Sequence, residues 1–474
     1  KMEDLKSFRD RFRVPITDQQ VEDLSYYKPP NNSPEIRYLK KCRKELGGPL
    51  PSRRLTGDKL TIPKLSVFDR LLNETGDREI STTQALVQAM TILCRDKNIG
   101  QRVVPIVPDE ARTFGMEGMF RQIGIYAHEG QKYEPVDREQ LMYYKENQSG
   151  QMLQEGITED GAMSSWIAAA TSFSNSGMQM IPFYMFYSMF GFQRIGDLIW
   201  AAGDMQARGF LIGATSGRTT LNGEGLQHED GHSQIMAGNV PNCISYDPTF
   251  SYELLVIMHD AMTRMFKKQE NVFYYITTMN ENYAHPGLTR GQEKNIVKGM
   301  YLLQKGKKGK VRVQLLGSGA ILRESIAAAE LLSADFKVQT DIWSCPSFNE
   351  LKRDGDEVFR WNLLHPDKKP RKCHVTQCLD NTEGPVVAAT DYVKLFADQI
   401  RAYVPKSFTV LGTDGYGRSD SREALRKHFE VDRYYIALAA LNALYAEGSI
   451  SAKTVKSAIK KYGIDPEKTN PLFS

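Results

Sequence analysis

The chain has 474 residues, of which 41% are hydrophobic and 25% charged, and its net charge is +4. This length exceeds the usual size of one domain, so we expect two or three domains, each with its own core. The small net charge does not indicate a nucleic-acid partner, and no apolar run reaches the roughly twenty residues of a membrane span. The start, KMEDLKSFRDRF, lacks an initiating Met and shows no signal peptide, so we expect a processed or truncated piece of a longer protein.

The six cysteines favour a reducing compartment. They form no CxxC pair and no regular framework, and several lie in apolar runs. We therefore expect a cytoplasmic protein without structural zinc. The cysteines are Cys42, Cys94, Cys243, Cys345, Cys373 and Cys378.

Residues 1–58 form a polar, helical lead-in. Ser33-Pro34-Glu35 predicts a helix start, because serine caps a helix and proline suits its first turn. The glycines and prolines at 47–51 then interrupt the pattern. The segment is too short for a domain, so we expect it to be the helical tail of a domain that lies upstream.

Residues 59–288 alternate between short apolar strands and helices, which predicts a parallel sheet with helices on both faces. One helix is expected to begin at Thr82 with Ser81 as its cap, and another to open at Ser164. The other predicted helices span 192–206 and 251–266. The predicted strands are 103–107, 179–183, 210–214, 243–246 and 272–277.

Residues 289–474 repeat this alternation after a Gly/Lys-rich connection at 287–309, and predict a second α/β domain. Closing helices are expected from Asp420, with Glu423 as its capping-box partner, and from Asp432 and Ser451. The predicted fold class is thus α/β, with two consecutive domains that each hold a mostly parallel sheet covered by helices. The remaining predicted elements are strands 311–316, 337–342 and 408–411 and helices 322–332 and 385–403.

Glu159 is the first candidate for chemistry. It lies in a turn within QEGITEDGAMSSW, before a helix that carries Trp166 and a run of alanines. A carboxyl held between apolar neighbours has its charged form destabilised and can pass a proton near neutral pH. The alternative is a solvated acid at a helix N-terminus, which favours the helix dipole.

A long loop at 213–228 follows a predicted strand and is rich in small and polar residues, which favours a functional loop. His228 and His232 stand four apart, the spacing of a zinc helix, but Gly231 between them makes a regular helix doubtful. Zinc is therefore the minority interpretation. Tyr187 and Phe190 follow another strand, where aromatic rings either pack in the core or flank a planar heterocycle.

Two glycine-rich turns have weaker signals. Gly317-Ser318-Gly319 joins a strand to a helix and could bind phosphate, but it lacks the third glycine of a dinucleotide fingerprint. The glycines of 412–417 permit a turn without indicating a ligand. Plain tight turns are the favoured interpretation of both segments.

Taken together, these segments resemble the thiamine-diphosphate enzymes of the transketolase superfamily. They are more specifically similar to the decarboxylating dehydrogenase component of bacterial pyruvate dehydrogenase complexes, homodimeric type. The resemblance spans nearly the whole chain and implies transketolase-like pyrimidine-binding and C-terminal domains. It is carried by residues 107–137, 154–173 (QEGITEDGAMSSWIAAATSF), 181–197 (IPFYMFYSMFGFQRIGD), 213–233 (GATSGRTTLNGEGLQHEDGHS) and 411–429.

The resemblance implies oxidative decarboxylation of pyruvate and reductive acetylation of a lipoyl group on the dihydrolipoamide acetyltransferase. Thiamine diphosphate would supply the carbanion chemistry, and Glu159 would hydrogen-bond its aminopyrimidine ring. Phe190 would lie against that ring. The remaining implied site residues are Ile157 and Arg194 near the ring, Tyr187, His228 and Glu224 near the substrate, and Asp109 and Glu110 at the entrance.

One feature of the family is missing from the sequence. The family holds magnesium and the diphosphate through a Gly-Asp-Gly motif followed by an Asn pair, and no such arrangement occurs here. We therefore expect no metal ligands in this chain, the Mg²⁺ site upstream of Lys1, and the cofactor at the interface of a homodimer. The alternatives are another 2-oxo acid dehydrogenase, a transketolase, a non-catalytic dimerisation and docking module, and, more distantly, a zinc hydrolase.

Overall fold

The computed structural model describes residues 1–48, 54–108 and 111–474, and divides into two compact units, Lys1–Leu55 and Thr56–Ser474. The first unit is helical. Ser33 accepts a hydrogen bond from the backbone N–H of Ile36 at 3.3 Å, which confirms the predicted helix start. Among the residues of its helices only Val21 is buried. These helices are α1 (Met2–Arg11), α2 (Asp18–Glu22) and α3 (Pro34–Glu45).

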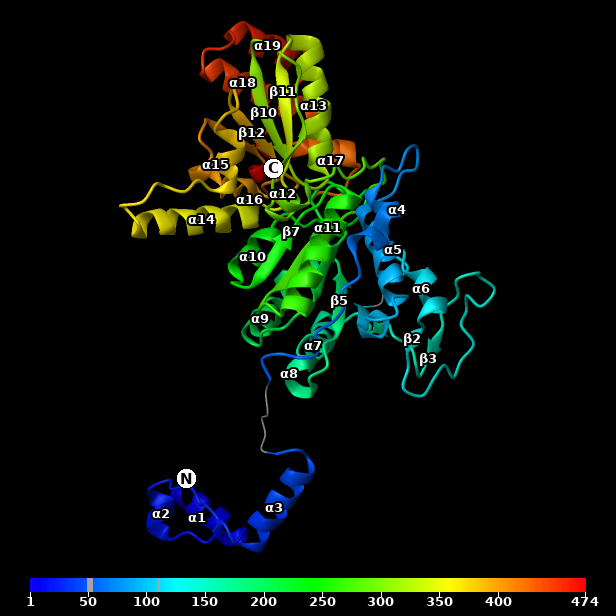
Figure 1. Ribbon diagram of the computed structural model, residues 1–474, viewed down its shortest axis with the longest axis vertical. Helices are drawn as coiled ribbons and strands as arrows, with labels where there is room; N and C mark the ends of the chain where they lie inside the picture. The colour runs from blue at the N-terminus through cyan, green and yellow to red at the C-terminus, as the bar shows by residue number, and fades with distance from the viewer. Residues whose placement is uncertain (49–53, 109–110) are drawn as a thin grey trace. The chain divides into compact units, whose positions relative to one another are not determined.

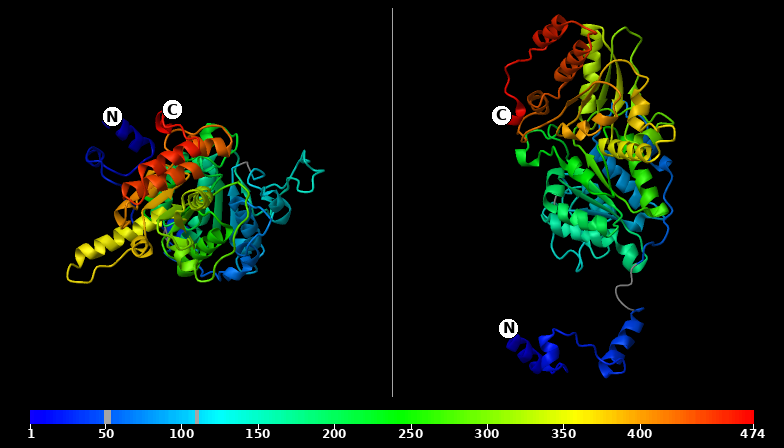
Figure 2. Two further views of the ribbon diagram at one scale, coloured as in Figure 1. Left: turned by 90° about the horizontal axis from the view of Figure 1, so that it is seen from above. Right: turned by 90° about the vertical axis from the view of Figure 1, so that its left-hand side faces the viewer.

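The second unit contains two large sheets and a small two-stranded one (Figures 1 and 2). The first sheet has six parallel strands in the order β4-β1-β5-β6-β8-β7. Every residue of the four strands β5 to β8 is buried, as expected where helices cover both faces of a sheet. The strands are β1 (Val103–Val107), β4 (Leu153–Gln154), β5 (Ile181–Phe186), β6 (Phe210–Ala214), β7 (Cys243–Tyr246) and β8 (Phe273–Thr278).

Helices pack on both faces of this sheet. One layer contains α7, α9 and α10, and the other contains α5 and α11. The short strands β2 (Ile125–Tyr126) and β3 (Glu146–Asn147) pair with each other in an excursion beyond the sheet. The helices are α4 (Asp69–Leu72), α5 (Thr82–Cys94), α6 (Glu117–Gln122), α7 (Glu159–Ala170), α8 (Ser172–Ser176), α9 (Gly191–Asp204), α10 (Ser233–Asn239) and α11 (Ser251–Met262).

The second sheet has five strands in the order β13-β12-β10-β11-β9, and only its edge strand β9 is antiparallel. Its strands are β9 (Tyr301–Gln304), β10 (Arg312–Gly317), β11 (Gln339–Ser344), β12 (Val386–Ala389) and β13 (Phe408–Leu411). The helices of this part are α12 (Glu293–Val297), α13 (Ile321–Phe336), α14 (Phe348–Leu364), α15 (His374–Leu379), α16 (Leu395–Asp398), α17 (Arg422–His428), α18 (Arg433–Ala446) and α19 (Ala452–Lys461).

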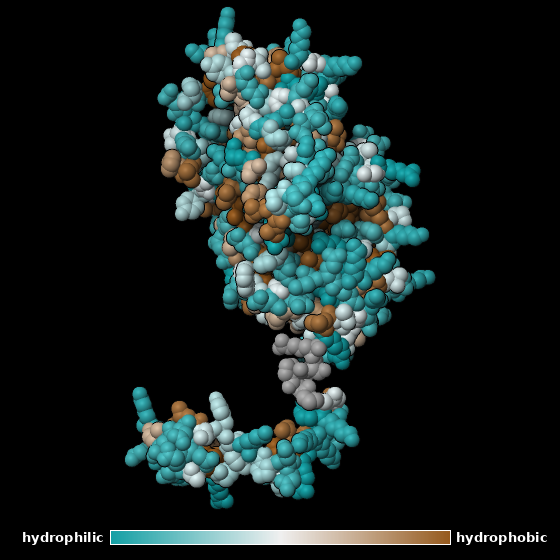
Figure 3. Space-filling model, turned by 60° about the vertical axis from the view of Figure 1, so that its left-hand side comes forward, coloured by the Kyte–Doolittle hydropathy of each residue, from teal (hydrophilic) through white to brown (hydrophobic). Residues whose placement is uncertain are grey.

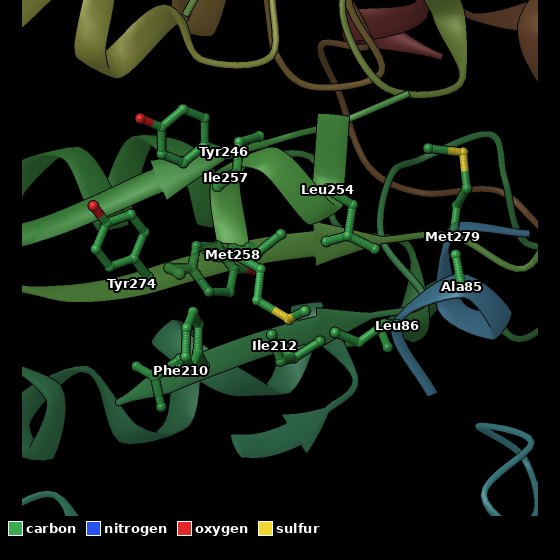
Figure 4. Packing of buried hydrophobic residues seen from close by; sticks show 14 of the residues in the cluster. Ala85, Leu86, Phe210, Ile212, Tyr246, Leu254, Ile257, Met258, Tyr274 and Met279 are labelled. Carbon is green, nitrogen blue, oxygen red and sulfur yellow. The ribbon is translucent and has the colours of Figure 1, made fainter. Parts of the chain in front are cut away.

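A continuous apolar cluster fills the space between sheet and helices. Figure 4 shows Met258 of α11 pointing towards Ile212 of β6, with Leu86 of α5 beside them. The same cluster includes Leu315 of β10, so apolar packing joins the two sheets. On the outer face drawn in Figure 3, hydrophilic residues predominate and hydrophobic ones gather in patches. Among the described residues no helix combines the length and apolarity needed to cross a membrane.

Three sequence predictions about this fold are wrong. The long helix expected at 385–403 is replaced by β12 and the short α16, because Val386 and Val387 are buried and paired with β10 and β13. The connection at 287–309 contains α12 and β9. The cap predicted at Asp420 is displaced by one residue, since Ser421 caps α17 by accepting a hydrogen bond from the backbone N–H of Ala424.

Candidate active site

The candidate site lies where neighbouring parallel strands end. Tyr187 follows β5 directly and leads into the 3₁₀ turn Ser188–Phe190, while the long loop after β6 ends in the 3₁₀ turn Leu226–His228. β5 and β6 are paired and parallel, so their carboxyl ends lie at the same edge of the sheet. This edge is where open α/β sheets bind ligands.

Three of the predicted side chains meet there as a cluster of rings. The ring of His228 lies 5.0 Å from that of Tyr187 and 5.1 Å from that of Phe190, measured between centroids. The Tyr187 and Phe190 rings are 6.0 Å apart in an edge-to-face arrangement, and Phe114 packs 5.5 Å behind Tyr187. The structure therefore brings together aromatic residues that the sequence placed in two separate segments.

The orientation of His228 is set by its own turn. Its Nδ1 lies 3.3 Å from the carbonyl oxygen of Gly225. A carbonyl oxygen can only accept, so Nδ1 carries the proton in this contact. In the neutral ring Nε2 is then the free acceptor, which suits a histidine that accepts or returns a proton.

Glu159 is the first residue of α7. Thr158 caps the helix by accepting from the backbone N–H of Gly161 at 3.2 Å. The Glu159 carboxylate accepts a hydrogen bond from Arg194 of α9 at 2.6 Å. The Tyr184 hydroxyl donates to the backbone carbonyl oxygen of Glu159 at 3.4 Å. The Glu159 side chain is 14% exposed and that of Arg194 is 49% exposed.

Two expectations about Glu159 are therefore wrong. The helix begins at Glu159 rather than at Ser164, because the side chain of Thr158 satisfies its first turn. The surroundings of the carboxylate are also not purely apolar, since a guanidinium binds it directly. The carboxylate is nonetheless largely shielded from solvent and lies on the ligand-binding side of the fold.

Arg194 links Glu159 to the ring cluster. Its guanidinium carbon lies 4.0 Å from the centroid of Phe190, over the ring, while one of its nitrogens donates to Glu159. A planar group with N–H donors thus stacks on Phe190 and hydrogen-bonds Glu159 at the same time. The carboxylate and the ring therefore both contact the same flat, nitrogen-bearing group.

Two further predicted residues, Ile157 and Glu224, lie outside this cluster. The Ile157 side chain is 76% exposed, and Glu224 is also exposed on the loop before His228. Asp109 and Glu110, expected at the entrance, lie outside the described residues. For Ile157 and Glu224, which are among the described residues, the structure supplies no contact with the rings or with the Glu159 carboxylate.

The zinc alternative gains no support from the geometry. His228 ends a 3₁₀ turn and His232 precedes α10, so the two are not on one helix. His232 contacts Gln193 through its Nε2, at 3.1 Å. Among the described residues no group of three or more His, Cys, Asp or Glu side chains is placed to hold a metal ion.

The two glycine turns are structural. Ser318 donates to the buried carboxylate of Asp247 at 2.9 Å, and an acid at this position would repel a phosphate. In the second turn Asp414 accepts from the backbone N–H of Lys394 at 2.9 Å, which ties the turn to a neighbouring loop. Both observations favour the tight-turn interpretation.

Residues of the second sheet that hold the loop before His228 were missed by sequence reasoning. Asp391 follows β12 and binds Thr219 of that loop, and Arg422 of α17 donates to Thr220. The one available signal is the Thr-Asp pair directly after an apolar segment, but that segment lies in the helix predicted at 385–403. No local sequence pattern predicts hydrogen bonds between residues this far apart in the chain.

Solved structures of known proteins define the class of fold. The described chain superimposes on a transketolase from Leishmania mexicana with a TM-score of 0.59 and 15% identity, over 81% of this chain and 48% of that one. A transketolase from Campylobacter jejuni gives a TM-score of 0.57 with 15% identity, over 93% of this chain and 59% of that one. The fold is therefore transketolase-like, and the predicted α/β class with mostly parallel sheets is confirmed.

Sequence comparisons define the family. Residues 61–286 match the pyruvate dehydrogenase E1 component middle domain, and residues 299–432 match the transketolase-like C-terminal domain. The pyruvate dehydrogenase E1 component of Cupriavidus necator is 59% identical over 99% of this chain, and that of Escherichia coli K12 is 57% identical over 100%. The chain belongs to the pyruvate dehydrogenase E1 component family. It spans about half of these relatives, 53% of each.

Proposed function

We propose that this chain forms the pyrimidine-binding half of a thiamine-diphosphate site that decarboxylates pyruvate and acetylates a lipoyl group. The observation that carries the proposal is the Arg194 guanidinium, held between Phe190 at 4.0 Å and Glu159 at 2.6 Å. Membership of the family supports the choice of pyruvate over a ketose or a larger 2-oxo acid.

The residues present fit an aminopyrimidine. Such a ring is flat, offers a π face to an aromatic side chain and carries nitrogens that hydrogen-bond a carboxylate. The guanidinium of Arg194 has the same two properties and satisfies both Phe190 and Glu159. When bound, thiamine diphosphate supplies the carbanion chemistry that protein side chains lack.

The roles of the side chains follow from their positions. Glu159 holds the proton of a ring nitrogen, and its low exposure strengthens that hydrogen bond. Phe190 orients the ring by stacking. His228 presents a free Nε2 next to the Tyr187 ring, where it can accept or return a proton at the reacting carbonyl group. For four further residues the roles rest on the resemblance alone: Ile157 and Glu224 beside this half-site, and Asp109 and Glu110, which lie outside the described residues, at its entrance.

The rest of the site comes from outside this chain. Relatives are about twice as long, and the sequence has no Gly-Asp-Gly motif with an Asn pair to hold Mg²⁺ and the diphosphate. We place these ligands in the remaining half of the family's polypeptide and the cofactor at the interface of a homodimer. Residues 1–58 would then be the tail of that half, 59–288 the pyrimidine-binding domain and 289–474 the C-terminal domain.

The partner and the compartment are proposed on the same basis. Acetyl transfer requires a lipoyl domain of the dihydrolipoamide acetyltransferase to reach the site within a multienzyme complex. A cytoplasmic location is supported by the six cysteines, all of which are free.

The proposal predicts that Glu159→Gln in the complete enzyme lowers kcat by about 10²-fold or more, the usual contribution of a positioned acid or base. The amide keeps the shape and the contact with Arg194 but cannot take the proton. Asp160→Asn is the matched control, because Asp160 is exposed, also lies in the first turn of α7 and affects the helix dipole equally. Near-normal turnover of pyruvate by the Glu159→Gln enzyme would refute the assignment.

The alternatives can be separated in the same preparation. Decarboxylation of 2-oxoglutarate at the rate for pyruvate would indicate a different 2-oxo acid dehydrogenase, and ketose transfer would indicate a transketolase. A complete enzyme that forms dimers but turns over none of these substrates would indicate a docking module.

A further inference from the structure

The loop that carries His228, residues 215–232, is held by segments next to the second sheet: the residues that follow β12, and α17 with the residues before it. We call it the His228 loop. Its first anchor is Asp391, which follows β12 and is 2% exposed. The Asp391 carboxylate accepts from the backbone N–H of Thr219 at 3.1 Å and from its hydroxyl at 2.8 Å. The carbonyl oxygen of Asp391 also accepts from the backbone N–H of Arg218, at 3.3 Å.

Gly217 allows this close approach. Its φ is +88°, and a Cβ there would lie 2.1 Å from the Oδ2 of Asp391. Any side chain at this position would therefore push the loop off its anchor. The absence of a side chain at Gly217 thus lets the loop backbone lie directly against the Asp391 carboxylate.

Helix α17 provides the next anchors. Arg422 donates through Nε to the carbonyl oxygen of Thr220 at 2.6 Å, and through Nη2 to Asn280 at 3.1 Å. Just before the helix, the carbonyl oxygen of Asp420 accepts from the backbone N–H of Gly223 at 3.0 Å. Three successive parts of the loop are thus fixed before it reaches the site.

The far end of the loop is held by the same part of the chain. Glu229, next to His228, accepts from the backbone N–H of Arg418 at 2.6 Å and is 1% exposed. The backbone N–H of Val393 donates to the carbonyl oxygen of Gly231 at 2.8 Å. Between these two ends no described residue anchors the tip in this way: Leu226 is 50% exposed, while His228 turns inward to the rings.

We propose that Asp391 and Arg422 are positioning residues, which hold the His228 loop from the second sheet so that His228 stays against Tyr187 and Phe190. The part of the chain that contains the second sheet then fixes the position of an active-site loop. This inference rests on the proposed function for the role of His228, but the anchoring of the loop can be measured without substrate or cofactor.

The first test is hydrogen exchange in this 474-residue chain. Asp391→Asn keeps the shape but replaces one acceptor oxygen with a donor that faces Thr219. We expect the loop amides of Thr219 and Gly223 to exchange about tenfold faster, which corresponds to the loss of one strong hydrogen bond.

Asp341→Asn is the matched control. Asp341 lies in β11, is also buried, and binds Arg312 at 2.6 Å and the backbone N–H of Gly306 at 2.8 Å, remote from the loop. We expect it to leave exchange in the His228 loop unchanged. The inference is overturned if Asp391→Asn leaves the loop at its original rate, or if both variants accelerate it equally.

The second test uses the complete enzyme and Arg422. Arg422→Met removes the donor to Thr220, and we expect kcat to fall about tenfold while the KM for cofactor changes little, because Glu159 and Phe190 are untouched. Arg422→Lys keeps a donor and should restore most of the rate. Equal losses in both variants would contradict a positioning role. If no enzyme turns over pyruvate while loop exchange still responds, the proposed function fails and the anchoring stands.

Discussion

The contact between Arg194 and Glu159 contributes little free energy, and this determines how easily a ligand can replace it. The arginine side chain is half exposed, and ion pairs of this kind contribute roughly 0.2–1 kcal/mol. Stacking over Phe190 adds about as much at an exposed position. A ligand that stacks on the ring and binds the carboxylate can therefore displace the guanidinium at little cost.

Buried carboxyl groups surround the loop and the joint between the sheets. Burial raises the pKa of Asp247, Asp391 and Glu229 to about 7 in each case. Hydrogen bonds from Thr277 and Ser318 only partly offset this effect at Asp247. These groups take up protons near neutral pH although none of them belongs to the ring cluster.

The raised pKa of Asp247 predicts a pH dependence of stability. Its ordinary value is 3.8, so the folded protein binds this proton more tightly than the unfolded chain. The resulting stabilisation is fully present below about pH 4 and is lost as the pH rises through about 7. In Asp247→Asn the free energy of unfolding should fall less between about pH 5 and pH 8, by roughly 3 kcal/mol. Denaturant titrations of both proteins at the two pH values test this, and parallel pH profiles would contradict it.

At the scale of elements, α11 packs its buried side chains against the first sheet. Met258 is fully buried between this helix and β6 (Figure 4). Met205, directly after α9, is 43% exposed. Met258→Ala should cost roughly 2–5 kcal/mol, because truncation leaves a cavity in a packed core. Met205→Ala, which removes the same atoms at the surface, should change stability by less than about 0.5 kcal/mol. Chemical denaturation of the two variants compares them, and equal losses would show that the packing around α11 does not dominate.

The strands show what sequence patterns can and cannot predict. β1, β6 and β7 have the bounds expected from their apolar residues, because a short run that is almost entirely buried has few alternatives. The bounds of the edge strand β13 also match, although only its first residue is buried. The helix predicted for the segment from Val386 was wrong, because the alanines of this segment also suit a helix. Only pairing with β10 and β13, which are distant in sequence, selects the strand.

The candidate site shows the same division. The resemblance to a known family indicated the residues that form the ring cluster. The hydrogen bond from Arg194 to Glu159 and the anchoring of Thr219 by Asp391 were not predicted. Both join residues on different elements, and their geometry depends on how those elements pack.

At the scale of the whole molecule, the two sheets form one body. Glu253 of α11 is fully buried and accepts hydrogen bonds from Tyr301 of β9 at 2.6 Å and Ser344 of β11 at 2.5 Å. The apolar cluster continues across the same joint. The second sheet is therefore fixed relative to the first. This is required if residues next to the second sheet are to hold the His228 loop in place.

The division of the site between this chain and the rest of the enzyme predicts how the isolated chain binds its cofactor. It offers a stacking ring and a carboxylate but, on our account, no ligands for the diphosphate. Calorimetry of the 474-residue chain with thiamine diphosphate and Mg²⁺ should show no saturable binding at micromolar concentrations. Tight, magnesium-dependent binding to this chain alone would contradict the proposed division.

The most direct test of the central claim is the rate at which the complete enzyme exchanges the C2 proton of bound thiamine diphosphate with deuterated solvent. If Glu159 controls the proton on the pyrimidine, Glu159→Gln should slow this exchange by about 10²-fold or more, while Asp160→Asn leaves it unchanged. Exchange at the unmodified rate in the Glu159→Gln enzyme would show that this carboxylate does not perform the proposed role.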